Sequence, residues 1–250
     1  MTHLLTLRNL KLVITYEGTD FSGWQYQKEG RTVQASIEEA VERITGERLR
    51  VIGAGRTDAG VHALRQVANF KTLSTIPTQN LKRALNSLLP QDLKILEIEE
   101  VPLEFHARHS AKAKVYEYRV LSSEAPDVLR RRFVWQIPYR LRDEFLRASL
   151  KYIVGEHDFS SFRSTGSGVK SPVRTMYEAD LRVEGELYRF IFRANGFLRH
   201  MVRNIVGTLV QMSLKERTPE EFLYLLEKRD RTLAGPKAPP QGLYLVEVIY

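Results

Sequence analysis

The residues with the clearest chemical potential lie in one glycine-rich segment, residues 53–63, with the sequence Gly-Ala-Gly-Arg-Thr-Asp-Ala-Gly-Val-His-Ala. Its three glycines permit tight turns with positive φ, and they flank one guanidinium, Arg56, and one carboxylate, Asp58. The ordinary interpretation is an aspartate that caps its own turn and an arginine that lies in solvent. The alternative is a carboxylate on a stiff loop, kept ionised by the guanidinium two residues away. The spacing by itself leaves both open.

A second group of polar and aromatic residues belongs to a predicted strand, residues 112–121. Its alternation places four side chains on one face: Lys112, Lys114, Tyr116 and Tyr118. Lysines and tyrosines on a sheet face can hold phosphates and stack on a base. The more ordinary explanation is a half-exposed strand whose tyrosine rings cap the edge of the core.

Two arginines lie near the start of a predicted helix, residues 198–214. Arg199 and Arg203 are four residues apart, so they share one side of the helix beside its apolar stripe. An arginine in a mostly buried helix usually has a partner, because an unpaired guanidinium is unfavourable in apolar surroundings. A structural salt bridge would satisfy Arg203. Alternatively, Arg203 meets Asp58 across the boundary between two domains.

Several other chemistries fit the sequence poorly. The glycine segment lacks the Gly-Lys-Ser/Thr ending of a phosphate-binding P-loop, and no Rossmann spacing follows it. The six histidines are scattered, and His106 and His109 are too few for a metal site without further ligands. Cysteine is absent, which removes thiolate chemistry and disulfides, and no serine nucleophile elbow is present.

The elements that must position these residues follow the order β-α-β-β-α-β twice. In the first half the expected strands are 12–16, 49–52, 66–71 and 93–101, with helices from Thr32 to Gly46 and from 77 to Pro90. In the second half the strands are 112–121, 133–137, 174–183, 187–193 and 242–250, with helices over 141–154 and 198–214 and a third opening at 218–219. Residues 158–172 are rich in Ser and Gly and predict a mobile surface loop.

This order predicts an α+β protein with two ferredoxin-like βαββαβ domains, each an antiparallel sheet with helices on one face. We expect an N-terminal domain, residues 1–105, that carries the Asp58 loop, and a C-terminal domain, residues 106–250. The boundary is uncertain by several residues.

Charge is distributed unevenly between these halves. The chain of 250 residues has a net charge of +8, yet residues 1–105 hold 13 basic and 13 acidic side chains, so the whole excess falls on residues 106–250. A basic half suits a polyanionic partner, although a soluble protein can also be basic without one. No apolar run is long enough to span a membrane and no secretory leader is evident, so we expect a cytoplasmic protein.

At these residues the chain resembles the tRNA pseudouridine synthase A (TruA) family. Segment 55–63 is similar to that family's catalytic signature. The similarity continues through segments 16–25, 31–34, 105–108, 116–118, 195–207 and 243–246. Ordered motifs over nearly the whole chain are far more specific than one glycine loop. The family often has a basic residue where this chain has Glu117, a difference that bears on RNA contacts near that strand and not on the reaction.

The resemblance implies an isomerase that converts uridine to pseudouridine at positions 38–40 of the tRNA anticodon stem-loop, without metal, nucleotide or organic cofactor. Asp58 would act on the ribose, either as nucleophile at C1′ or as the base that removes a C2′ proton. Arg203 and Arg56 would support it, and Tyr116 would stack on the target uracil. The resemblance also implies an active-site cleft between the two domains, with the basic C-terminal domain, residues 106–250, binding RNA and completing the site. Lys112, Lys114 and Arg199 would contact RNA. Family members are homodimers with one tRNA lying across both subunits.

The residues leave two alternatives to the isomerase open. One is a non-catalytic tRNA-binding or chaperone protein with paired ferredoxin-like domains. The effect of replacing Asp58 on pseudouridine formation would distinguish the enzyme from this protein. The other is a hydrolase of the nucleoside bond, which needs a second carboxylate to act as acid or to activate water. Asp20 is the nearest candidate by motif.

Overall fold

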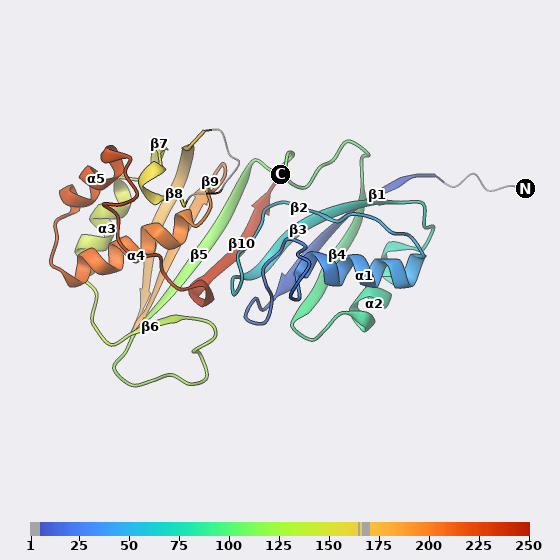
Figure 1. The fold of residues 1–250 in the computed structure, drawn as a ribbon, viewed down its shortest axis with the longest axis horizontal. Helices are drawn as coiled ribbons and strands as arrows, with labels where there is room; N and C mark the ends of the chain where they lie inside the picture. The colour runs from blue at the N-terminus through green and yellow to red at the C-terminus, as the bar shows by residue number, and fades with distance from the viewer. Residues whose placement is uncertain (1–5, 165, 167–170) are drawn as a thin grey trace, which may run out of the picture. The chain divides into compact units, whose positions relative to one another are not determined.

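The chain forms a mixed α+β structure, seen in a computed structural model that describes residues 6–164, 166 and 171–250. It divides into two compact units, each described here by itself (Figure 1). Unit 1 comprises Met1–Lys112 and Leu245–Tyr250, and unit 2 comprises Ala113–Tyr244. The chain therefore returns to unit 1 with its last strand.

Unit 1 has the element order expected for the first half. Its elements are β1 (Arg8–Tyr16), α1 (Val33–Thr45), β2 (Ile52–Gly53), β3 (His62–Thr72), α2 (Thr78–Leu88) and β4 (Leu93–Val101). The sheet has the order β4-β1-β3, with β2 paired to β3 and β10 (Leu243–Ile249) next in order after β3. The pairs of β1 with β3 and with β4 are antiparallel.

The helices of unit 1 begin and end where the sequence indicates. The Thr32 hydroxyl accepts a hydrogen bond from the Ala35 amide, and Gly46 closes α1 with φ 75°, a left-handed conformation that glycine adopts readily. Helices α1 and α2 pack against each other over one face of the sheet (Figure 1). They cover fully buried side chains such as Leu12, Ile37 and Leu81.

The strand expected at residues 49–52 is much shorter than predicted. Only Ile52 and Gly53 pair with β3. The Val51 amide instead donates to the Glu38 carboxylate of α1, at 2.9 Å. A side chain of the neighbouring helix thus takes a hydrogen bond that a longer strand would have made with the sheet.

The second half of the chain contains every strand and helix expected there and one additional strand, and all of them except the last strand, β10, belong to unit 2. Its elements are β5 (Ala113–Ser122), β6 (Trp135–Ile137), α3 (Asp143–Lys151), β7 (Gly155–Asp158), β8 (Val173–Glu184), β9 (Leu187–Ala194), α4 (Met201–Leu214) and α5 (Pro219–Lys228). The order β5-β9-β8-β7 is antiparallel throughout, and β6 is parallel to β5. The three helices gather on one side of this sheet (Figure 1). Strand β7 was not predicted, because its four residues carry no alternating pattern.

The prediction of a surface loop over residues 158–172 is wrong for its first part. Phe159 and Phe162 are fully buried around a short 3₁₀ turn, and the Phe162 ring stacks on Phe222 of α5 at 5.5 Å. Two phenylalanines this close supply apolar surface that packs against the helices. Residues 165 and 167–170 lie outside the described part of the chain.

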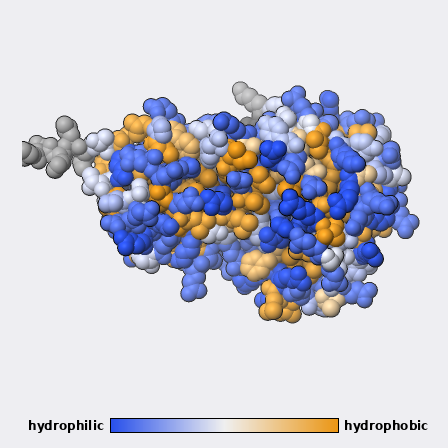
Figure 2. All heavy atoms as spheres, turned by 180° about the vertical axis from the view of Figure 1, so that it is seen from behind, coloured by the Kyte–Doolittle hydropathy of each residue, from blue (hydrophilic) through white to orange (hydrophobic). Residues whose placement is uncertain are grey.

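Helix α4 begins at Met201, later than the predicted start at residue 198. His200 has φ 62°, so the residues before it form a turn rather than a first helical turn. Thr218 starts α5 through a capping box with Glu221, as its sequence indicates. Of the helices in the described residues, none is long and apolar enough to cross a membrane. The face shown in Figure 2 is mostly hydrophilic, with smaller apolar areas between the charged side chains.

Candidate active site

The Asp58 loop of unit 1 is anchored through the residue that precedes the carboxylate. The Thr57 hydroxyl forms a 2.7 Å hydrogen bond with the Tyr16 hydroxyl at the end of β1, and the Thr57 carbonyl accepts from the Trp24 amide at 3.0 Å. The Asp58 carbonyl accepts from the Val61 amide, which closes the following turn. Burial raises the pKa of Tyr16 to about 12, against weaker opposing hydrogen bonds from Thr57 and Gln66. The phenol therefore stays neutral at physiological pH.

Two glycines let the segment after β1 approach this loop at backbone distance. A Cβ at Gly18 would lie 1.9 Å from the Val61 carbonyl oxygen. A Cβ at Gly23, whose φ is 94°, would lie 2.7 Å from the Thr57 carbonyl oxygen. No other residue fits either position without moving the loop that carries Asp58.

The strands on either side of the loop add further constraints. The pairing of β1 with β3 shifts between Ile14 and Tyr16, where β3 has one extra residue. Bulges of this kind turn a strand sharply and are frequent beside active sites. Before the loop, the Gly55 carbonyl accepts from the Gln66 side chain at 2.9 Å. The loop is held at its start, its middle and its end.

The aromatic residues of segment 21–26 differ in burial. Phe21 and Trp24 are buried and lie 6.3 and 6.4 Å from the Tyr16 ring, so they support the Asp58 loop from beneath. Tyr26 is 55% exposed. The first two rings are therefore part of the core rather than a surface for stacking on a base.

The two charged residues of the loop differ in exposure. Asp58 is half-buried, whereas Arg56 is exposed. Within the part of the chain that the structure describes, the Arg56 guanidinium makes no hydrogen bond or ion pair. Its cation remains available to a ligand, and a role for Arg56 in supporting Asp58 stays a prediction.

Tyr116 lies on β5 of unit 2 with most of its ring buried. Its ring packs edge-on against Phe197, with the ring centroids 4.9 Å apart, and 8% of the residue is exposed. The next residue, Glu117, is also buried and binds both Arg119 and Arg189. Burial is the largest influence on the pKa of Glu117 and raises it, but the two guanidinium groups outweigh burial and the net pKa is lowered.

Arg203 lies in the first turns of α4 and is buried. Its Nε donates to the Ala238 carbonyl at 2.8 Å, and the Ala238 amide donates back to the Arg203 carbonyl at 3.0 Å. The segment carrying Ala238 reaches the helix because Gly207 has no side chain, since a Cβ there would lie 1.9 Å from the Pro236 carbonyl oxygen. Close by, burial raises the pKa of Tyr118 far above its usual value, and the Arg203 charge opposes this rise.

The predicted site residues are divided between the two units. Asp58 and Arg56 share one loop of unit 1, and the Lys112 amide pairs with the Ile249 carbonyl there. Lys114, Tyr116, Arg199 and Arg203 belong to unit 2, where Arg199 is exposed and Lys114 is half-exposed. A contact between Asp58 and Arg203 stays a prediction. The sequence did not predict that Thr57 anchors the Asp58 loop or that Phe197 packs against Tyr116. The glycines near these two residues were the only signal in the sequence.

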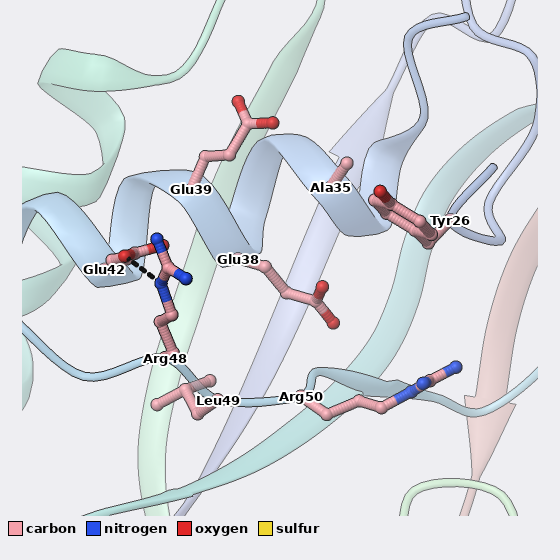
Figure 3. Close-up of a pocket in the computed structure, with 8 residues that line it drawn as sticks. All are labelled: Tyr26, Ala35, Glu38, Glu39, Glu42, Arg48, Leu49 and Arg50. Carbon is pink, nitrogen blue, oxygen red and sulfur yellow. Dashed lines mark hydrogen bonds and ion pairs between the residues drawn. The ribbon is translucent and has the colours of Figure 1, made fainter. Parts of the chain in front are cut away.

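Two open cavities lie on unit 1, and neither has the chemistry of the site. The first, about 450 Å³, is lined by α1 and the segment after it (Figure 3): Tyr26, Ala35, Glu38, Glu39, Glu42, Arg48, Leu49 and Arg50. Its three glutamates repel the phosphates of a nucleic acid. The second, about 440 Å³, includes Ile52, Leu103 and Phe105. Among the described residues no group of three or more His, Asp or Glu is placed to hold a metal.

Comparison with known proteins identifies the family. The sequence profile described as tRNA pseudouridine synthase matches residues 12–110 and 150–250. The chain is 45% identical over 244 residues to tRNA pseudouridine synthase A of Thermoanaerobacter sp. (strain X514), which covers 98% of this chain and 100% of the relative. It is 46% identical over the same length and coverage to the protein of that name from Acetivibrio thermocellus.

Among solved structures, a Cbf5-Nop10-Gar1 complex aligns with 13% identity and a TM-score of 0.34. The alignment covers 94% of this chain and 57% of the other, and a likeness this low does not bear on the fold. The two long stretches that match the family profile, and relatives that match over their entire length, decide the matter. This chain belongs to the tRNA pseudouridine synthases, enzymes that isomerise uridine in tRNA to pseudouridine.

Proposed function

We propose that this enzyme modifies uridines at positions 38–40 of the tRNA anticodon stem-loop and that Asp58 carries the chemistry. The supporting observation is the restraint on the Asp58 loop, where Thr57 is fixed through both its hydroxyl and its carbonyl. Such restraint is what a catalytic group needs, because a misplacement of about 1 Å can reduce a rate by about 100-fold. A turn that only reverses the chain would not need it.

The reaction needs few groups. The N1–C1′ bond breaks, the uracil turns, and C5 joins C1′, so atoms and oxidation state balance without a cofactor. The Asp58 carboxylate either attacks C1′ or removes a proton from C2′. Arg203 keeps that carboxylate charged in a site from which water is excluded. Arg56, exposed on the same loop, fills the space left by the extruded nucleotide or holds the displaced one.

Recognition falls mainly to the second half of the chain. Tyr116 stacks on the target uracil while the glycosidic bond is open, and Lys112, Lys114 and Arg199 contact the RNA backbone. Both units are ferredoxin-like domains, with the active-site cleft between them. The enzyme acts as a homodimer, for which a sedimentation mass of twice 28.9 kDa is the simplest check.

Replacing Asp58 with Ala tests the proposal. We expect pseudouridine formation in an unmodified tRNA transcript to fall below detection while the Kd for tRNA stays within about threefold of wild type, because the carboxylate acts on ribose and not on phosphate. Asp180→Ala is the control, since this half-exposed residue of β8 makes, among the described residues, one ion pair, with Arg182 at 3.7 Å. Pseudouridine is mapped position by position in both variants.

Three outcomes would contradict the proposal. Unchanged activity in Asp58→Ala would remove the carboxylate from the mechanism. Wild-type protein that binds tRNA but forms no pseudouridine would favour the non-catalytic alternative. Release of free uracil would favour hydrolysis with Asp20 as the second carboxylate.

A further inference from the structure

Arg174, near the start of β8, is a half-buried cation with an incomplete set of partners. Its Nη1 donates to the carbonyl oxygens of Ser171 at 2.9 Å and Val173 at 2.5 Å. Within residues 6–164, 166 and 171–250, no carboxylate pairs with Arg174, and no acceptor meets its Nε or Nη2. Three of its five N–H groups therefore remain for a ligand or for water.

Partial burial makes this arrangement unfavourable unless an anion completes it. Burial lowers the pKa of Arg174, although arginine remains charged at physiological pH. Two neighbouring arginines of the same sheet, on β9, instead pair with carboxylates. Arg189 binds Glu117 and Glu184, and Arg193 approaches Glu178 at 3.5 Å. Arg174 has only neutral carbonyls, which offset less of the desolvation.

The turn from Asn195 to Phe197 lies directly against Arg174. A Cβ at Gly196 would be 3.5 Å from the Arg174 Nε. The turn is tied to β8, since the Asn195 amide donates to the Thr175 carbonyl and the Asn195 side chain accepts from the Thr175 amide, both at 3.1 Å. In the part of the chain that is described, the amides of Gly196 and Phe197 have no hydrogen-bond acceptor. Successive unpaired amides beside a guanidinium form an anion-binding concavity.

The same turn joins this concavity to Tyr116. Phe197, the neighbour of Gly196 in sequence, packs edge-on against the Tyr116 ring. Arg174 and Tyr116 therefore lie against adjacent residues of one turn, the first at Gly196 and the second at Phe197.

We propose that Arg174, together with the amides of Gly196 and Phe197, binds one phosphate of the nucleotide whose base lies against Tyr116. The inference rests on the proposed function, because it takes tRNA as the ligand and Tyr116 as the base-stacking ring. Its chemistry is recognition of a phosphodiester by a planar guanidinium. The competing explanation is a purely structural one, in which Arg174 only ties the start of β8 to its own carbonyls.

The experiment compares Arg174→Gln, Arg174→Lys and the control Arg147→Gln. Arg147 is exposed on α3 and donates to the Leu181 carbonyl of β8 at 2.7 Å, so its replacement removes a similar carbonyl contact without the anion site. Each variant is titrated with unmodified tRNA transcript at several KCl concentrations. Single-turnover pseudouridine formation is then measured at saturating tRNA.

For Arg174→Gln we expect a Kd about tenfold higher and a salt dependence, log Kd against log [KCl], that is shallower by about 0.7 to 0.9. The Arg174→Lys variant should keep the wild-type salt dependence but recover only part of the affinity, because lysine keeps the positive charge and lacks the planar, two-pronged donor geometry of the guanidinium. The Arg147 control keeps the wild-type slope. A purely structural role instead predicts lower thermal stability, an unchanged slope and no rescue by Lys, and this result would overturn the proposal.

Replacing one phosphate of the tRNA with a neutral linkage tests which phosphate Arg174 binds. The transcript is assembled with one methylphosphonate next to the target uridine, on its 5′ or its 3′ side. At one of these positions the neutral linkage should weaken binding to wild type and have little further effect on Arg174→Gln. Additive losses at both would contradict the assignment. The two proposals fail separately, since active wild-type enzyme with an unchanged Arg174→Gln slope rejects only the phosphate site.

Discussion

Asp58 owes its position to residues that have no part in the chemistry. Thr57 contributes a hydroxyl and a carbonyl to neighbouring segments, and Gly18 contributes the space that a side chain would fill. These contacts restrict the backbone conformations of the Asp58 loop, so less conformational entropy is lost when substrate binds. Changes at these positions should affect rate before they affect tRNA affinity.

Gly18→Ala should reduce the rate of pseudouridine formation by about 100-fold at saturating tRNA. The new methyl group would lie 1.9 Å from the Val61 carbonyl oxygen, so the Asp58 loop must move. Gly185→Ala is the matched control. That glycine has φ 62° in the β8–β9 hairpin and no neighbour within 4 Å, so its change strains the backbone without touching the site. Equal rate losses in the two variants would contradict this account.

Tyr16→Phe should change the pH dependence of stability. At pH 8 the variant loses about 1–3 kcal/mol, because the buried Thr57 hydroxyl is left without its partner. Burial raises the pKa of Tyr16 from its usual value of about 10 to about 12, so its contribution is complete below pH 10 and is lost as pH rises from 10 to 12. The difference between wild type and variant should therefore shrink by about 1 kcal/mol at pH 11.

Urea unfolding at pH 8 and pH 11 measures this difference. The other tyrosines are common to both proteins, so their contributions cancel. A stability difference that is the same at both pH values would show that Tyr16 does not titrate as its burial indicates.

At the scale of elements, α4 is fixed near both of its ends. Near its start, Arg203 exchanges hydrogen bonds with Ala238, in the segment that follows α5. At its end, the Arg142 guanidinium donates to the carbonyls of Met212 and Ser213 and to that of Arg217 just beyond the helix. A cation there also complements the negative end of the helix dipole. The helix that carries Arg203 is thus held by two loops rather than by its own propensity.

Arg142→Ala should lower the free energy of unfolding by about 2 kcal/mol, since several carbonyls lose a charged donor. Arg182→Ala is the control, because Arg182 is exposed and lies 3.7 Å from Asp180. Such surface pairs contribute about 0–1 kcal/mol. Chemical denaturation of both variants measures the difference, and equal losses would exclude the capping role.

At the scale of the whole molecule, the distribution of charge suits a tRNA substrate better than either small cavity does. The excess of +8 lies entirely in residues 106–250, whereas the larger cavity of unit 1 is lined by glutamates. A macromolecular polyanion is held over a broad surface through many phosphate contacts, each of which releases counterions. Binding should therefore be strongly dependent on salt.

We expect the affinity of the wild-type enzyme for tRNA to fall at least tenfold between about 50 and 200 mM KCl. The rate at saturating tRNA should change little, because salt acts on phosphate contacts and not on the reaction at ribose. Filter binding and single-turnover assays measure the two quantities. A salt-independent Kd would contradict a mainly electrostatic interface.

Local sequence determined most of the elements. Thr32, Gly46 and the Thr218 capping box fix helix ends through hydrogen bonds within a few residues, so their positions could be predicted. The glycine signature and its companion motifs were enough to indicate the family, and the comparisons confirm it. The roles of Asp58, Arg56, Arg203 and Tyr116 stay predictions.

What only the tertiary structure decided depends on contacts distant in sequence. The shortened β2, the buried Phe159 and Phe162, and the hydrogen bond between Tyr16 and Thr57 each involve partners that no local pattern identifies. The same holds for Arg174, whose residue type says only that it is charged. Its burial, its lack of a carboxylate within the described residues, and its place beside the Phe197 turn come from packing between strands and loops. Short-range hydrogen bonding can be read from a sequence, but burial and long-range pairing exist only once the chain has folded.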